Sequence, residues 1–168
     1  MRLRCAVVMM TWVALLGPAA GQGRGPEQER LSAMVGRWQT EVEVKATAPA
    51  QAAKVTGTEE CAWFANLHVV CRTDATADAG PYSAIRLISY HAVLKQYSIY
   101  TIDSTGAALQ AFGQVSGDTW TFTADSAESK SRLVITMTPT GYTGTNELAI
   151  RNGPWTAVST VKATRLEP

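Results

Sequence analysis

Two cysteines around a short aromatic and apolar run are the first residues whose types and spacing indicate chemistry. Cys61 and Cys71 enclose the run AWFANLHVV, in which His68 is the one further metal-binding residue. A structural zinc site needs four ligands, and a redox pair usually has the spacing CxxC at the start of a helix. Asn66 lies midway between the cysteines, so a hairpin that turns there places them opposite each other, as a disulfide requires. The spacing therefore favours a disulfide over a metal site or a redox pair.

Three further pairings support the same hairpin register. It places Trp63 opposite Val69, Glu60 opposite Arg72 and Phe64 opposite His68. Each such pair contributes about 0.2–1 kcal/mol to a sheet. We expect the disulfide itself to stabilise the fold by about 2–3 kcal/mol, because it closes a short loop in the unfolded chain.

The sequence has two histidines, His68 and His91, which are the candidates for acid–base chemistry. Nucleophilic catalysis needs a histidine within hydrogen-bond reach of a serine, together with a carboxylate that orients it. Ser89, Ser104 and Asp103 are near His91 in the sequence, but no spacing specifies that they converge. The sequence therefore assigns no catalytic residue, and we favour a role without catalysis.

The N-terminus has the three-part pattern of a secretory signal peptide over residues 1–21. Arg2 and Arg4 form a basic start, residues 5–17 are apolar, and small residues lead up to Gly21, after which we expect cleavage. The apolar run is too short to span a membrane, which takes about 20 residues. We therefore predict a secreted or periplasmic protein without a membrane span.

The chain after the signal peptide is predicted to consist of a flexible leader, residues 22–28, and one domain, residues 29–168. Loss of two arginines with the signal peptide changes the net charge from +1 to −1. A nearly neutral chain without a basic run argues against nucleic acid as a partner. The two cysteines that remain form an even number, which in an exported protein also indicates a disulfide.

Hydrophobic periodicity predicts one short helix followed by strands. Leu31, Met34 and Val35 have helical spacing, and Gly36 ends the helix. The rest of the chain alternates with period two between turn signals. The predicted strands cover residues 36–46, 54–64, 67–74, 82–91, 95–103, 107–115, 118–124, 131–138, 141–150 and 154–164.

These elements predict an all-β fold, an up-and-down antiparallel β-barrel of about ten strands with a short N-terminal helix. The loops are too short for crossover helices, so neighbouring strands must be antiparallel. Closure removes the unpaired edges of such a sheet. A two-sheet sandwich is the alternative fold.

A barrel of about ten strands is wide enough to leave an internal cavity. We expect it to bind a small, largely apolar molecule, and the candidate ligand-binding residues are Arg86, Tyr90, His91, Tyr97 and Tyr100. A slip of one residue in any strand would reverse the face on which its side chains lie. The alternatives are an envelope structural or protein-interaction module with a filled barrel, and a hydrolase or isomerase at the barrel mouth.

The segment LSAMVGRW resembles the opening of the lipocalin and wider calycin families, in which a Gly-x-Trp motif follows a short helix and starts the first strand. Gly36 and Trp38 carry this match. The resemblance implies that Trp38 packs against Arg165 across the closed end of the barrel. A guanidinium over an indole ring contributes about 0.5–2 kcal/mol.

The segment LISYHAVLKQYSIYTIDSTG resembles the pattern Y-D-x-x-x-K-x-Y…D-S-x-G of a bacterial lipocalin-like family of unknown function. The matching residues are Tyr90, Lys95, Tyr97, Asp103, Ser104 and Gly106. His91 stands where an acidic residue is usual in that family. The resemblance extends over residues 29–166 and implies a barrel fold and an exported setting, without an activity.

Some small ten-stranded barrels hold haem through a histidine, and His91 is the candidate axial ligand here. Its neighbours form no recognisable haem motif. We therefore predict neither a cofactor nor a metal ion.

Overall fold

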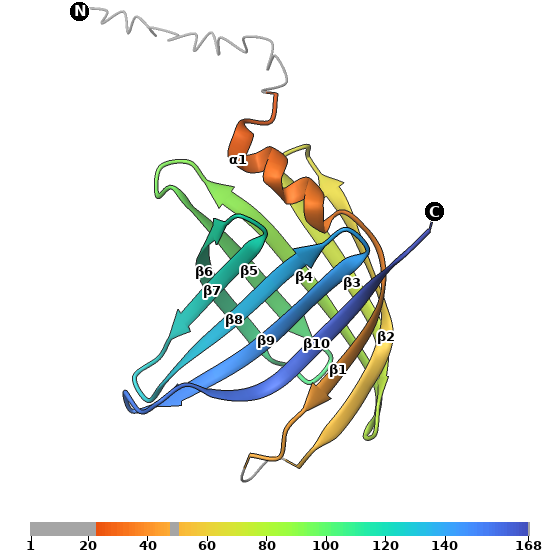
Figure 1. The fold of residues 1–168 in the computed structure, drawn as a ribbon, viewed down its shortest axis with the longest axis vertical. Helices are drawn as coiled ribbons and strands as arrows, with labels where there is room; N and C mark the ends of the chain where they lie inside the picture. The colour runs from red at the N-terminus through yellow and green to blue at the C-terminus, as the bar shows by residue number, and fades with distance from the viewer. Residues whose placement is uncertain (1–22, 48–50, 168) are drawn as a thin grey trace, which may run out of the picture.

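The computed structural model describes residues 23–47 and 51–167, in which ten β-strands form a closed antiparallel barrel (Figure 1). The predicted signal peptide lies outside these residues. The strands are β1 (Gly36–Val44), β2 (Ala53–Phe64), β3 (His68–Ala77), β4 (Gly80–His91), β5 (Gln96–Asp103), β6 (Ala108–Ser116), β7 (Thr119–Asp125), β8 (Ser129–Thr138), β9 (Gly141–Ile150) and β10 (Thr156–Leu166).

The barrel closes between its first and last strands. Val42 of β1 pairs with Val55 of β2 on one side and with Val161 of β10 on the other. Each of the strands β2 to β9 pairs with the strands that precede and follow it in the sequence. The predicted barrel is therefore confirmed, and the sandwich alternative is wrong.

The predicted N-terminal helix is present as a single turn, α1 (Pro26–Glu29), which continues into a 3-10 helix, η1 (Arg30–Met34). It starts earlier than the predicted domain boundary at residue 29, so part of the predicted leader belongs to the folded domain. Proline suits the first turn of a helix because its fixed φ matches and its missing N–H would have no partner there. The helix lies across one end of the barrel, which we call the helix end (Figure 1).

The hairpin of β2 and β3 has the predicted register. Cys61 pairs with Cys71, and the two form a disulfide. The turn places Ala65 and Asn66 at positive φ angles, 49° and 59°. Asparagine adopts this conformation more readily than most residues, which explains its place at the turn.

A cation–π contact closes the helix end. The guanidinium carbon of Arg165 lies 4.1 Å from the centre of the Trp38 ring, and its nitrogens donate to the carbonyl oxygens of Val35 and Ala33. A Cβ atom on Gly36 would lie 2.5 Å from Nη1 of Arg165, and the φ of Gly36 is +142°. The glycine of the Gly-x-Trp motif is therefore favoured for two physical reasons, its positive φ angle and the close approach of Arg165.

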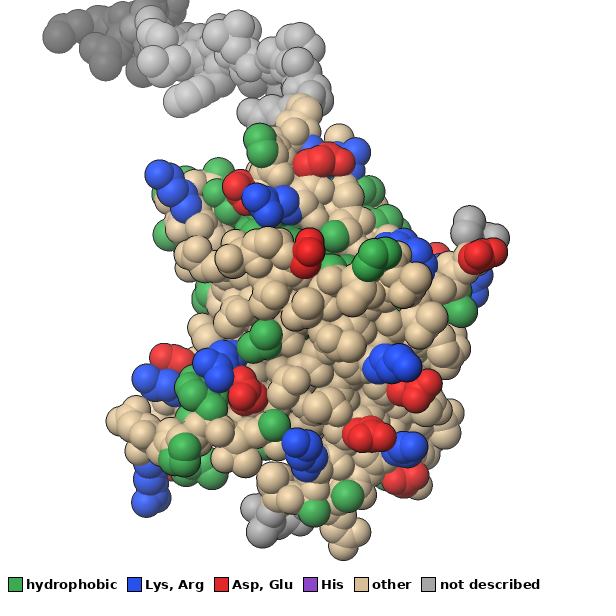
Figure 2. Space-filling view, in the orientation of Figure 1, with side chains coloured by type: hydrophobic (Ala, Val, Ile, Leu, Met, Phe, Trp, Pro, Cys, Tyr) green, Lys and Arg blue, Asp and Glu red, His purple; other side chains and the backbone are tan. Residues whose placement is uncertain are grey.

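The character of the helices and the distribution of surface charge bear on possible partners. Along the described chain, no helix combines the length and apolar character needed to cross a bilayer. On the face shown in Figure 2, acidic and basic side chains are interspersed. That face therefore presents no basic patch of the kind that binds nucleic acid.

Candidate ligand-binding cavity

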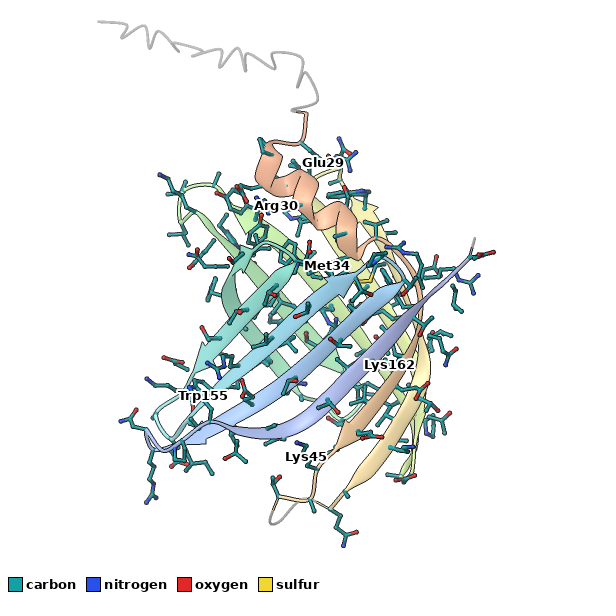
Figure 3. The ribbon with its side chains drawn as sticks, in the orientation of Figure 1. Glu29, Arg30, Met34, Lys45, Trp155 and Lys162 are labelled. Carbon is teal, nitrogen blue, oxygen red and sulfur yellow. A yellow bond between two sulfur atoms is a disulfide. The ribbon has the colours of Figure 1, made fainter. Side chains whose placement is uncertain are left out.

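The end of the barrel opposite the helix, which we call the open end, contains a cavity of about 300 Å³. Figure 3 shows the two ends, with Met34 at the helix end and Lys45 and Trp155 at the open end. The cavity is mostly apolar with several polar groups. Its lining consists of Arg86, Ile99, Thr101, Asp103, Ala107, Leu109, Ala111, Phe122, Ser131, Arg132, Leu133 and Asn146.

The floor of the cavity is Arg86, which β4 directs into the barrel. Its Nη2 atom lies 3.1 Å from Oε2 of Glu59, a β2 residue that is only 3% exposed. The Arg86 side chain keeps 25% of its surface accessible. Arg86 thus separates the open cavity from the packed helix end, and Glu59 lies on the far side.

Glu59 is the centre of a buried polar cluster built by four strands. Besides the ion pair with Arg86, it accepts hydrogen bonds from the Thr73 hydroxyl at 3.1 Å and the Tyr142 hydroxyl at 3.0 Å. Within the described residues, no buried side-chain polar atom lacks a partner. A buried charge is tolerated only when it is paired and hydrogen-bonded in this way.

The cluster fixes the protonation of its own members. The charge of Glu59 raises the pKa of Arg86, so the guanidinium stays protonated. Burial, followed by the charge of Glu59, raises the pKa of Tyr142, so its hydroxyl stays a donor. The floor therefore presents a guanidinium with a fixed charge and a fixed position.

Asp103 lies at the mouth of the cavity and organises the turn between β5 and β6. Its Oδ1 atom accepts hydrogen bonds from the backbone N–H groups of Thr105 and Ala107, and from the Thr105 hydroxyl. The bond from the Thr105 hydroxyl is the main reason that the pKa of Asp103 is lowered. Gly106 in the same turn has a φ of +86°. The sequence DSTG is therefore a turn motif, stabilised by an aspartate that bonds to its own backbone.

Of the five predicted ligand-binding residues, the structure places Arg86 alone in the cavity lining. Tyr90 and Tyr97 point into the barrel but pack at the helix end, with ring centres 5.0 Å apart. The Tyr97 hydroxyl donates to the Glu27 carboxylate at 2.6 Å. The bond from Tyr97 fastens the helix to the barrel, and neither tyrosine is part of the cavity lining.

Tyr100 and His91 lie on the outer face of the barrel, so their predicted place in the cavity is wrong. Tyr100 follows Ile99, which lines the cavity, and successive side chains of a strand point to opposite faces. His91 is exposed, and its Nε2 atom lies 2.9 Å from the Ser98 hydroxyl oxygen on the outer face. Because His91 cannot reach the interior, it cannot be the axial ligand of a haem bound there.

Both histidines contact serines on the outer face. His68 Nδ1 lies 2.8 Å from the Ser89 hydroxyl oxygen, and His91 has the similar contact with Ser98. Among the described residues, no hydrogen bond or ion pair joins either histidine to a carboxylate. The orienting acid of a catalytic triad is thus missing from these serine–histidine pairs.

A candidate metal cluster is ruled out by the disulfide. Glu59, Cys61 and Cys71 place ligand-type atoms within 4.8 Å of one another. The two sulfur atoms are bonded to each other, so they are not free thiolates. This group of residues therefore offers one carboxylate, which is already paired with Arg86.

Sequence reasoning missed Glu59, Thr73 and Tyr142. A signal for Glu59 was present, because it lies two residues before Cys61 and so shares the inward face of β2. A carboxylate at an inward position requires a partner, and the inward arginine is Arg86. The hydroxyl groups gave no such signal, since threonine and tyrosine are ordinary residues of a strand.

Together the fold and the cavity define a small antiparallel β-barrel protein that is packed at one end and hollow at the other. The chain belongs to the family described as "Protein of unknown function (DUF1579)", whose model matches residues 24–165. Among curated proteins, none matches the chain.

Solved structures that resemble this chain share little sequence with it. Rv2717c from M. tuberculosis has a TM-score of 0.65 and 13% identity, over 85% of this chain and 99% of its own. A de novo designed fluorescence-activating β-barrel has a TM-score of 0.44 and 14% identity, over 80% of this chain and 95% of its own. A redesigned barrel, mFAP0, bound to DFHBI, has a TM-score of 0.46 and 12% identity, over 79% of this chain and 99% of its own. At this identity, the similarity to Rv2717c shows the fold alone.

Proposed function

We propose that the protein binds a small, largely apolar molecule in the open-end cavity, without catalysis. The observation that carries this proposal is the cavity of about 300 Å³. Ligand pockets start at about 300 Å³ and are mostly apolar with a few polar groups. The lining of this cavity has that composition, with Ile99, Leu109, Phe122 and Leu133 as its apolar walls.

Two short side chains in the lining contribute to the space of the cavity. Ala107 and Ala111 line it and contribute one methyl group each. Ala111 is 5% exposed and pairs with Ile99 on the neighbouring strand β5. A larger residue at position 111 should therefore occupy the space that we assign to the ligand.

A neutral fluorescent probe, N-phenyl-1-naphthylamine, tests this proposal. The wild-type protein should enhance its fluorescence on binding, and Ala111→Phe should weaken the binding at least tenfold. Ala108→Phe is the matched control, because Ala108 lies on the same strand but is exposed and pairs with Ile102 on the outer face. Circular dichroism checks that both variants fold. Equal affinity of Ala111→Phe and wild type would contradict the proposal.

We also propose that the protein is secreted or periplasmic. The N-terminal pattern over residues 1–21 and the Cys61–Cys71 disulfide support this, since structural disulfides persist in oxidising compartments. Mass spectrometry of the protein from its own host should give a chain that starts at Gln22. An intact N-terminus in the cell interior would contradict this proposal.

We infer that the family is a branch of the lipocalin-like barrels. Support comes from the Gly36 and Trp38 motif and from the contact of Arg165 with Trp38 at the helix end. A solved structure of another family member tests the inference, because its equivalent glycine, tryptophan and arginine should make the same contact. A member in which the arginine lies in solvent would contradict it.

A protein-interaction role is the second candidate. Several apolar side chains are exposed on the outer face of β4, β5 and β6, among them Ile85, Tyr100, Ile102 and Phe112. Exposed apolar patches often mark interaction surfaces. Self-association that Ile102→Lys abolishes and Ala111→Phe leaves intact would favour this role over ligand binding.

A further inference from the structure

The guanidinium of Arg86 has hydrogen-bond donors that its contact with Glu59 does not use. A guanidinium has five N–H donors and no acceptor. Nη2 lies against Glu59, the guanidinium is also close to the Tyr142 hydroxyl, and a quarter of the side chain remains accessible where it lines the cavity. The cavity floor therefore offers donors, and a ligand that satisfies them must present an acceptor atom.

The two positive charges of the cavity lining are already paired within the protein. Glu59 neutralises Arg86, and Glu147 binds Arg132, the other basic residue of the lining, at 2.7 Å. The Arg132 guanidinium also lies 4.4 Å from the centre of the Trp155 ring. The remaining charged group of the lining is Asp103, at the mouth. No positive charge in the lining is thus left for an anionic ligand to neutralise.

A charged ligand that reaches the floor of this cavity would lose hydration without gaining a net attraction there. An anion would leave water for a site whose arginines already have partners, and it would pass Asp103 on entry. A cation would meet the guanidinium of Arg86 at the floor. Moving an ion out of water is costly unless a new partner compensates for it. A neutral ligand avoids this cost.

We propose that the ligand is a neutral, largely apolar molecule with a carbonyl-type acceptor oxygen, which binds the cavity-facing N–H groups of Arg86. Its apolar body lies against Ile99, Leu109, Phe122 and Leu133. This inference rests on the proposed binding function and specifies the chemistry of the ligand. Arg86 is thereby the residue that selects the head group of the ligand, and the apolar walls select the size of the ligand body.

Three naphthalene derivatives of nearly equal shape test the inference: 2-acetylnaphthalene, 2-isopropylnaphthalene and 2-naphthoate. They carry a neutral acceptor, no polar atom and a carboxylate, respectively. Isothermal titration calorimetry with the full folded protein measures each affinity. We expect 2-acetylnaphthalene to bind about tenfold tighter than 2-isopropylnaphthalene, because burial of its oxygen is compensated by a charged donor. We expect 2-naphthoate to bind most weakly.

Variants assign the preference to Arg86. The double variant Arg86→Met with Glu59→Gln removes the donors without leaving a buried charge unpaired, and it should bind the ketone no tighter than the hydrocarbon. Arg37→Met, which changes an exposed arginine on the outer face of β1, should keep the preference. Because the wild-type series is informative by itself, the test does not depend on the folding of the double variant.

The outcomes separate this inference from the proposed function. If the hydrocarbon binds as tightly as the ketone, or if 2-naphthoate binds most tightly, the head-group inference is overturned while the binding function stands. If none of the three ligands binds and N-phenyl-1-naphthylamine does not bind either, the proposed function is overturned as well. If the double variant retains the preference, or if Arg37→Met removes it, the assignment to Arg86 is wrong.

Discussion

The helix end of the barrel is filled by large buried side chains, whereas the open end leaves a cavity between its lining residues. Leu31, Met34, Trp38 and Trp120 are all buried at the helix end. At the open end, the Leu109 side chain keeps 51% of its surface exposed although it points into the barrel. The difference indicates that one end supplies the stability of the fold, which leaves the interior of the other end free for a ligand. Substitutions at each end can break or sharpen this division.

Trp38→Ala should have the largest effect, because it removes one of the two buried tryptophans of the helix end. Trp38 is 1% exposed, and its Nε1 atom donates to the Met34 carbonyl oxygen. Replacement of a buried tryptophan by alanine costs about 3–5 kcal/mol of unfolding free energy. Urea denaturation measures the loss.

Leu109→Ala is the matched substitution at the open end. We expect it to cost less than about 1 kcal/mol, because half of the side chain is already exposed to solvent. Similar losses for Trp38→Ala and Leu109→Ala would contradict the division of the barrel into a packed end and a hollow end.

Removal of the disulfide should have the next largest effect. Cys61 pairs with Gly36 near the helix end, so the disulfide fastens strands that the helix also covers. The double variant Cys61→Ala with Cys71→Ala should lose about 2–3 kcal/mol of unfolding free energy. Wild-type protein in a reducing agent is the control and should lose a similar amount. Unchanged stability in both would mean that the hairpin needs no covalent link.

Arg165→Ala should cost about 1–2 kcal/mol, since it removes a cation–π contact and two hydrogen bonds to carbonyl oxygens. Lys162→Ala on the same strand is the control, because Lys162 is exposed on the outer face. Thermal and urea unfolding measure both variants. A loss below a few tenths of a kcal/mol for Arg165→Ala would show that the contact does not hold the helix end together.

Asp103→Ala should have the smallest effect, about 0.5–1.5 kcal/mol at neutral pH, through loss of the turn hydrogen bonds. These bonds lower the pKa of the Asp103 carboxyl, so its contribution is complete above the ordinary value of 3.8 and fades as the pH falls below it. The stability difference between wild type and variant should therefore shrink in acid. Asp103→Asn keeps an acceptor oxygen and should lose less. A difference that is constant down to the lowest pH would contradict this role.

The sequence was sufficient to predict the fold for two reasons. Alternation in segments such as WQTEVEVK indicates strands, and short loops between them leave no topology except a meander. The hairpin register followed from the position of Asn66 between the two cysteines, and the structure has that register. Both inferences depend on contacts between neighbours in the sequence.

The cavity lining was predicted less well because it depends on distant contacts. Alternation alone shows that Tyr90 and His91 cannot share a face, so His91 could have been excluded beside an inward Tyr90. Alternation could not have excluded Tyr97 in the same way, because Tyr97 does point inward. Its exclusion from the cavity depends on which end the helix covers, and Glu27, which accepts its hydrogen bond, lies far away in the sequence.

The most direct test of the account is the position of a bound ligand. Intermolecular nuclear Overhauser effects between 2-acetylnaphthalene and side-chain methyl groups would locate it in solution. We predict contacts with the methyl groups of Leu109 and Leu133, which line the open-end cavity. Contacts with Ile85 and Ile102, which are exposed on the outer face, would contradict the claim that the hollow end of the barrel is the binding site.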